Sequence, residues 1–154
     1  MPVYSDTNLL VRLYAEMPDS AETLQRFEKL RRDRGTRLPI TWLHQLEMAN
    51  ALQQLVFLAR KGEGIRMSPE RAVIALADFD EDLAAGHGLF PATVAATELV
   101  REARQLSLRH AAGHGVRAYD VAHVASALLL DCDVFWSYDA KANALARLEG
   151  LKTL

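Results

Sequence analysis

The sequence lacks the residues and runs that build disulfide scaffolds or membrane spans. Its 154 residues include a single cysteine, Cys132, so no internal disulfide can form. No apolar run approaches the roughly 20 residues that a transmembrane helix needs. The opening residues MPVYSD lack the basic and apolar parts of a signal peptide. These absences predict a cytoplasmic protein that does not associate with membranes.

An excess of positive charge is also missing. The net charge is −2, which argues against a protein that coats nucleic acid through bulk charge. Arginine nevertheless outnumbers lysine fourteen to four, and six cations lie within residues 26–37. The planar guanidinium suits phosphate, but a GC-rich genome gives the same bias. We interpret residues 26–37 as a solvated helix end, with a phosphate-binding patch as the alternative.

The order of apolar segments predicts an α/β fold in a single domain, residues 1–154. Short apolar strands are expected at 3–5, 38–41 and 133–137. Residues 89–93 fit either an edge strand or a loop, and residues 151–154 fit a last strand. Helices are expected at about 7–14, 20–34, 43–60, 69–85, 94–112, 118–130 and 141–148. Strands that alternate with helices imply right-handed crossovers and a parallel sheet covered on both faces.

Two carboxylates directly follow predicted strands. Asp6 comes after the first strand, and Asp139 after the strand over residues 133–137. Ligands of parallel sheets gather beyond the carboxyl ends of the strands. Each aspartate also has a simpler alternative role as the N-cap of the next helix.

Two further carboxylates lie in apolar surroundings. Glu47 has Leu43 and Ala51 as its helical neighbours one turn away, and Asp120 begins a strongly apolar helix. The alternative for Asp120 is a favourable interaction with the helix dipole. A buried carboxylate is costly without a partner, and an arginine, a backbone donor or a bound cation would each satisfy Glu47.

If these four carboxylates converge, they repel one another unless a cation neutralises them. Hard oxygen ligands favour Mg²⁺ or Mn²⁺ over zinc. Phosphoryl transfer with a metal-activated water is the chemistry that needs such an ion.

The segments around these carboxylates resemble the PIN-domain ribonucleases, and most closely the VapC-like toxins of type II toxin–antitoxin pairs. The segments are SDTNLL, QLEMANAL, RAYDVAHVASAL and FWSYDAKANALA, in the family's order over roughly residues 3–153. The resemblance implies a three-layer α/β/α sandwich with a four- or five-stranded parallel sheet. It also implies an endoribonuclease that depends on Mg²⁺ or Mn²⁺, is held inactive by a cognate antitoxin and forms a homodimer.

Site residues follow from the same resemblance. Asp6, Asp120 and Asp139 would hold the metal, and Glu47 would do so directly or through water. The polar residues beside the site would be Asn8 and Ser137. The sequence departs from some relatives after Asp139, where Lys141 and Asn143 replace a further acid. Asn143 would then supply either a neutral ligand or a contact to the ligands, and without the further acid one metal ion is expected rather than two.

Several other residues have competing interpretations. Arg117 is expected either to pair with a site carboxylate or to contact RNA phosphate. His123 is interpreted as a hydrogen-bonded core histidine rather than a metal ligand. The acidic segment 78–82 is interpreted as a solvated helix surface. Three aromatic residues are either core or base-stacking residues: Trp42, Trp136 and Tyr138.

Two other functions fit the sequence less well. A non-cleaving PIN-like module that binds RNA or protein would not need four carboxylates. A metal-dependent phosphatase of another α/β family would use a second aspartate two residues after Asp6, where this chain has Asn8. The sequence does not select among transfer, ribosomal and messenger RNA as the substrate.

Overall fold

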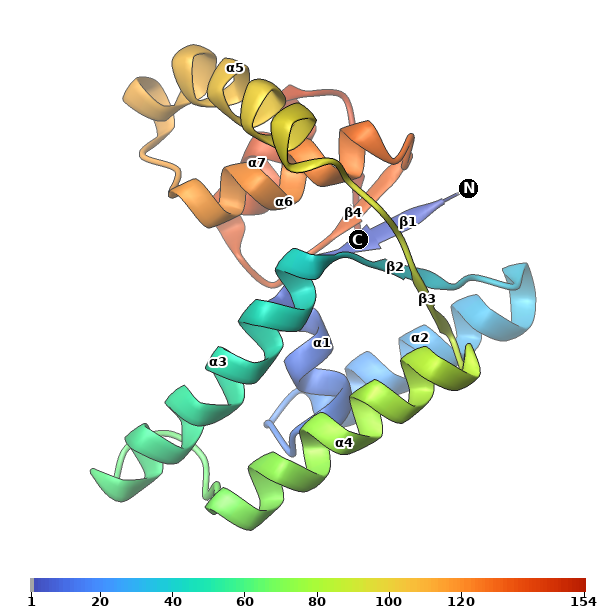
Figure 1. The fold of residues 1–154 in the computed structure, drawn as a ribbon, viewed down its shortest axis with the longest axis vertical. Coiled ribbons are helices and arrows are strands. Elements are labelled where there is room, and N and C mark those ends of the chain that lie inside the picture. Colours follow the sequence, from blue (N-terminus) through green and yellow to red (C-terminus); the bar gives the residue numbers. More distant parts are fainter. Residues whose placement is uncertain (1) are drawn as a thin grey trace. The chain divides into compact units, whose positions relative to one another are not determined.

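The computed structural model describes residues 2–154, in which seven helices connect five short strands, with two helices between successive strands from β1 to β4 and one between β4 and β5 (Figure 1). The strands are β1 (Val3–Ser5), β2 (Leu38–Ile40), β3 (Leu89–Pro91), β4 (Val134–Trp136) and β5 (Lys152–Thr153). The helices are α1 (Thr7–Tyr14), α2 (Ser20–Arg34), α3 (Trp42–Arg60), α4 (Pro69–Ala85), α5 (Ala96–His114), α6 (Ala118–Leu129) and α7 (Ala140–Leu148).

Contacts between residues divide the chain into two compact units. The first unit comprises the N-terminal segment through Asp6 together with residues 92–154, and the second comprises residues 7–91. The first unit therefore contains β1, β4, β5 and the helices α5 to α7. The second contains β2, β3 and the helices α1 to α4. Each unit is described separately below.

The sheet of the first unit is a parallel ladder in the order β1–β4–β5. Ser5 is paired with Trp136, the last residue of β4. The backbone N–H of Asp6 extends this ladder by donating to the Trp136 carbonyl at 3.2 Å. Because β1 and β4 run in the same direction, the residues that follow them, Asp6 and Ser137, lie at the same edge of the sheet.

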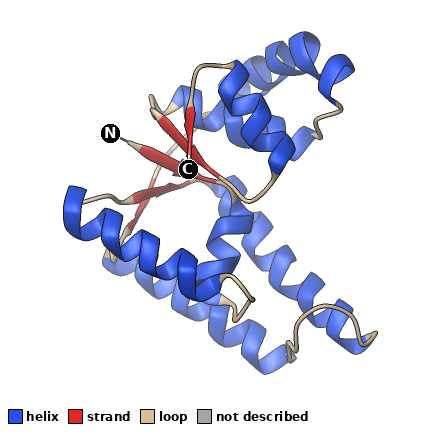
Figure 2. Cartoon of the chain, turned by 180° about the vertical axis from the view of Figure 1, so that it is seen from behind, coloured by secondary structure: helices blue, strands red, loops and turns tan. Residues whose placement is uncertain are grey.

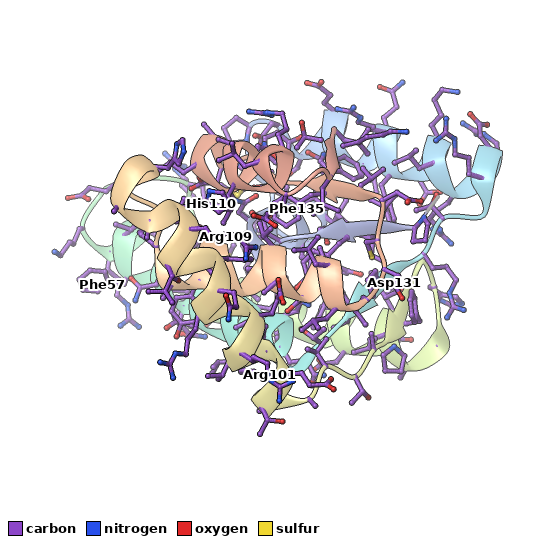
Figure 3. The ribbon with its side chains drawn as sticks, turned by 90° about the horizontal axis from the view of Figure 1, so that it is seen from above. Phe57, Arg101, Arg109, His110, Asp131 and Phe135 are labelled. Carbon is purple, nitrogen blue, oxygen red and sulfur yellow. The ribbon has the colours of Figure 1, made fainter. Side chains whose placement is uncertain are left out.

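The core of the first unit packs α6 and α7 against this sheet. Tyr4 stacks on Phe135, labelled in Figure 3, with ring centroids 5.9 Å apart, and both side chains are fully buried. The Tyr4 hydroxyl hydrogen-bonds to Nδ1 of His123 at 2.9 Å. The interpretation of His123 as a hydrogen-bonded core histidine is confirmed. Trp136 is also core, with 1% of its surface exposed, whereas Trp42 and Tyr138 remain 48% and 40% exposed.

The second unit has its own parallel pair of strands, with Leu38 opposite Leu89. Helix α2 ends at Gly35, which adopts the left-handed conformation with φ +63°. Helix α4 begins at Pro69, and Ser68 caps it by accepting a hydrogen bond from the backbone N–H of Arg71. These stop and start signals are local, and the sequence placed both boundaries correctly.

The interpretation of residues 78–82 as a solvated surface needs correction at Asp82. Asp78 is exposed, but Asp82 accepts a hydrogen bond from the Tyr14 hydroxyl at 2.8 Å. Burial, together with this bond to Asp82, raises the pKa of Tyr14 well above its usual range. Tyr14 also packs edge-on against Phe79 with ring centroids 5.6 Å apart. Asp82 therefore joins α1 to α4 inside the second unit.

The predicted α/β class with parallel strands is confirmed. The five strands hydrogen-bond as one group of three and one group of two (Figure 2). No helix within residues 2–154 is long and apolar enough to cross a membrane. The single domain over residues 1–154 stays a prediction.

Candidate active site

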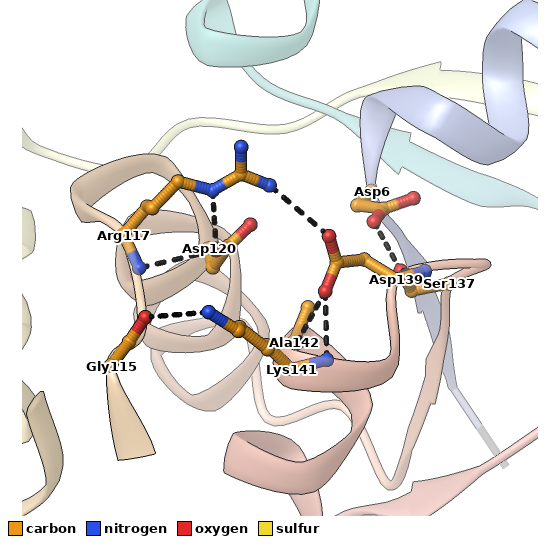
Figure 4. A network of polar contacts seen from close by, with 8 residues as sticks. All are labelled: Asp6, Gly115, Arg117, Asp120, Ser137, Asp139, Lys141 and Ala142. Carbon is orange, nitrogen blue, oxygen red and sulfur yellow. Dashed lines mark hydrogen bonds and ion pairs between the residues drawn. The ribbon is translucent and has the colours of Figure 1, made fainter. Parts of the chain in front are cut away.

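Asp139 uses its two carboxylate oxygens in different ways (Figure 4). Oδ1 caps α7 by accepting from the backbone N–H groups of Lys141 at 2.8 Å and Ala142 at 3.1 Å. Oδ2 accepts from Nη2 of Arg117 at 3.2 Å. The N-cap role expected as an alternative is therefore real. It fixes the carboxylate while leaving Oδ2 directed at a cation.

Asp120 faces the same cation. It lies in the first turn of α6, where its Oδ2 accepts from the backbone N–H of Arg117 at 3.2 Å. The same oxygen lies 3.5 Å from the Arg117 Nε. The Asp120 side chain is 14% exposed, whereas that of Arg117 is 75% exposed. One solvent-facing guanidinium thus contacts two partly buried carboxylates from different elements.

Ser137 connects the third aspartate to this pair. Its hydroxyl donates a short hydrogen bond to Oδ2 of Asp6 and accepts from the backbone N–H of Asp139 at 2.8 Å. Asp6 and Ser137 are each 5% exposed. Because Ser137 bonds to both, the positions of Asp6 and Asp139 depend on each other.

Asn143 has a side-chain oxygen that can still accept a hydrogen bond or bind a cation. Its Nδ2 donates to the Ser137 carbonyl at 2.8 Å, and its backbone N–H donates to the Asp139 carbonyl at 3.0 Å. Its Oδ1 is buried and has no hydrogen-bond partner within residues 2–154. A buried acceptor of this kind normally has a partner. Carboxylate and amide oxygens together are the donor set that Mg²⁺ or Mn²⁺ prefers, so the residues present fit such an ion.

The side chains of Asp6, Asp120 and Asp139 are not arranged as the ligands of one metal ion. Among the residues described, no three histidine, cysteine, aspartate or glutamate side chains are placed to hold a metal ion. Asp120 and Asp139 instead share Arg117, and Asp6 is joined to them through Ser137. The structure brings the three aspartates into one network, and their role as metal ligands stays a prediction.

Glu47 lies in the second unit, where one of its contacts is with a hydroxyl. Thr7 donates to its Oε2 at 2.8 Å. Both residues line a groove of about 410 Å³ between α1 and α3, which also contains Asn8 and Asn50. Thr7 was not among the predicted site residues, although it directly follows Asp6. The convergence of Glu47 with the aspartates stays a prediction.

The sequence matches the model of the PIN domain family over residues 3–148. The chain belongs to the PIN domain family. The predicted resemblance to PIN-domain proteins is confirmed. Among curated proteins, no sequence matches that of this PIN domain.

Solved structures share the PIN domain's fold at low identity. VapC20 of Mycobacterium tuberculosis, a sarcin–ricin loop cleaving toxin, is 15% identical with a TM-score of 0.63, covering 92% of this chain and 93% of VapC20. FitAcB of Neisseria gonorrhoeae is 12% identical with a TM-score of 0.60, and the match covers 99% of this chain and 96% of the FitAcB chain. PAE2754 of Pyrobaculum aerophilum is 16% identical with a TM-score of 0.59, and the match covers 99% of this chain and 89% of PAE2754. At these identities the likeness is one of fold.

Proposed function

We propose that this PIN domain is an endoribonuclease that depends on Mg²⁺ or Mn²⁺. The observation that carries the proposal is that Asp120 Oδ2 and Asp139 Oδ2 converge on one cationic group, with Asp6 linked to them through Ser137. Carboxylates arranged around one positive charge suit a divalent ion, and membership of the PIN family supports nuclease chemistry.

The proposed ligands are Asp6, Asp120 and Asp139, with Glu47 acting directly or through water and Asn143 Oδ1 as a neutral oxygen. Bound there, the ion would polarise the scissile phosphate and lower the pKa of an attacking water. The unpartnered Asn143 oxygen supports a ligand role for this residue.

The chain's own residues supply the positioning. Ser137 orients the Asp6 carboxylate by donating to Oδ2, and the α7 backbone fixes Asp139 through its other oxygen. Thr7 orients Glu47. These residues would not bind the metal themselves but hydrogen-bond to the residues that would, and such contacts typically set the orientation of metal ligands. Each carboxylate would therefore be held in place before any ion or substrate arrives.

Within this proposal the protein is a toxin. VapC20 is described as cleaving the sarcin–ricin loop, which supports a structured RNA loop as one candidate substrate here. A cognate antitoxin and a homodimer complete the proposal, with the antitoxin expected to cover the carboxylates. An RNA substrate would place the activity in the cytoplasm.

One observation favours a second candidate, a PIN-like module that binds RNA without cleaving it. Arg117 already neutralises Asp120 and Asp139, so the two carboxylates have a partner without a metal. The two candidates differ in whether a divalent ion displaces Arg117.

Cleavage of RNA by the purified protein tests the proposal. With Mg²⁺ or Mn²⁺ we expect discrete cleavage products that EDTA abolishes. Asp6→Asn should be folded by circular dichroism and inactive. If the parent protein leaves RNA intact with either metal, or if Asp6→Asn cuts as well as the parent, the nuclease assignment is wrong. Sequencing of RNA ends after brief induction in cells would then identify the substrate.

A further inference from the structure

A hollow in the second unit gathers arginine side chains. It measures about 380 Å³ and lies where the chain turns into β2 and into β3. Its lining includes Arg31, Arg32 and Arg37 but only one carboxylate, that of Glu28. The lining therefore carries an excess of positive charge.

Two of these arginines are held in place. Nη2 of Arg37 donates to the Leu89 carbonyl at 3.0 Å, and its guanidinium lies 5.4 Å from the centroid of the Phe90 ring. Nη1 of Arg31 donates to Glu28 at 2.8 Å, and its guanidinium lies 5.7 Å from the centroid of the Phe27 ring. Side chains held in this way lose less conformational entropy when a ligand binds.

Two glycines make room for the same guanidiniums. A Cβ on Gly88, at φ +77°, would lie 2.9 Å from the Phe27 ring and 3.0 Å from Nε of Arg31. A Cβ on Gly86, at φ +73°, would lie 3.0 Å from Nη2 of Arg37. Larger residues at either glycine would crowd the arginines. The turn between α4 and β3 is thus shaped around the two side chains.

The interpretation of residues 26–37 as a solvated helix end is therefore incomplete. It suits Arg26 and Arg34, which are exposed. Arg32 is also exposed and lies 4.0 Å from Asp33, but it lines the hollow as well. Arg31, which is half-buried, and Arg37, which is exposed, line the same hollow. A guanidinium has five N–H donors, and the contacts above use one from each arginine.

We propose that this hollow binds a phosphate group. Two held guanidiniums offer paired N–H donors that match the oxygens of a phosphate, and Arg32 adds a third positive charge beside them. The volume lies at the small end of the usual range for ligand sites. The phosphate could belong to an RNA backbone or to free phosphate, and the experiment distinguishes these sources. The proposal does not depend on RNA cleavage.

Nuclear magnetic resonance of the wild-type chain tests the site directly. The Nε–H signals of Arg31 and Arg37 are followed while inorganic phosphate, or a short single-stranded RNA, is added in EDTA to prevent cleavage. Shifts of both signals with both ligands identify an RNA backbone site. Shifts with phosphate alone identify a site for free phosphate. If neither ligand moves these signals more than those of Arg101 and Arg104 on α5, the proposal is overturned.

Substitution provides a second measurement if RNA moves the signals. The double variant R31Q/R37Q should bind the RNA roughly tenfold more weakly, and the slope of log affinity against log salt should fall by about 1.4 for two lost phosphate contacts. The control R101Q/R104Q removes the same charge from exposed arginines of α5 and should leave affinity nearly unchanged. Equal losses in both variants would show that bulk charge alone attracts RNA, and the site would be wrong.

Discussion

Arg117 and Asp139, 22 residues apart in the sequence, meet with Nη2 and Oδ2 at 3.2 Å. The same guanidinium approaches Oδ2 of Asp120 at 3.5 Å. A divalent ion held by these two aspartates would need the oxygens that Arg117 contacts. The central question for the site is therefore how this arginine and a metal ion share the two carboxylates.

Arg117→Gln should strengthen metal binding. The substitution removes a positive charge that competes with the ion, and Arg117 is exposed enough that solvent screens much of the effect. We expect Mn²⁺ to bind roughly three- to tenfold more tightly, measured by electron paramagnetic resonance of free Mn²⁺.

The control for Arg117 is Arg109→Gln. Arg109, labelled in Figure 3, is an exposed arginine that pairs with Glu149 at 3.0 Å. It should leave Mn²⁺ affinity unchanged. Weaker Mn²⁺ binding by Arg117→Gln would mean that the arginine organises the carboxylates rather than competing for them.

Ser137→Ala should disturb Asp6 and Asp139 together. It removes a donor to the buried Asp6 carboxylate and the acceptor for the Asp139 N–H. Urea denaturation should show a loss of about 1–3 kcal/mol in the free energy of unfolding. Metal affinity should fall by about 10- to 100-fold. Ser137→Thr keeps the hydroxyl and should retain most of the stability and most of the metal affinity. If Ser137→Thr loses as much of each as Ser137→Ala, the hydroxyl does not position the two aspartates.

Thr7→Val tests whether the orientation of Glu47 matters. Valine has nearly the shape of threonine but cannot donate to Oε2 of Glu47. We expect about 1 kcal/mol of lost stability and about tenfold slower RNA cleavage, with Thr7→Ser close to the parent. Normal cleavage by Thr7→Val would separate Glu47 from the reaction.

Glu149 should make stability depend on pH in the acid range. Burial alone would raise the pKa of Glu149, but hydrogen bonds from His110 and Arg109 outweigh it and hold the pKa below its usual 4.5. A lowered pKa in the folded state contributes stability that is complete above pH 4.5 and is lost as the pH falls through the folded-state value.

Glu149→Gln should therefore cost about 1–2 kcal/mol at pH 7, and this difference from the parent should shrink below pH 4.5. Urea denaturation at several pH values measures it. Glu81→Gln, at an exposed position on α4, should show no such trend. A cost for Glu149→Gln that does not change with pH would contradict the assignment.

The sequence predicted most element boundaries because the signals for them are local. Gly35 ends α2, Ser68 and Pro69 begin α4, and short apolar segments mark β1 to β4. Contacts between elements were harder to predict. Thr7 meets Glu47, and Tyr14 meets Asp82, only because particular helices pack together. The division of five strands into two ladders depends on the same packing.

The site was predictable in part, because the direction of the strands fixes where the residues after them lie. Aspartates after parallel strands had to lie at one sheet edge, so Asp6 and Asp139 could be placed together from the sequence. Arg117 could not be assigned, because the sequence allowed a carboxylate or a phosphate as its partner. Its side chain is long enough to reach either. In the structure it pairs with the carboxylates of Asp120 and Asp139, and a contact with RNA phosphate stays a prediction.

Mn²⁺ binding by the parent protein, Asp120→Asn and Asp139→Asn tests the central claim most directly. Asparagine keeps the shape of each side chain but removes the charge that an ion needs. The account predicts binding of one Mn²⁺ by the parent and at least about tenfold weaker binding by each variant, with circular dichroism spectra unchanged. Equal Mn²⁺ affinity in all three proteins, or no binding by the parent, would contradict the assignment of these carboxylates as a metal site.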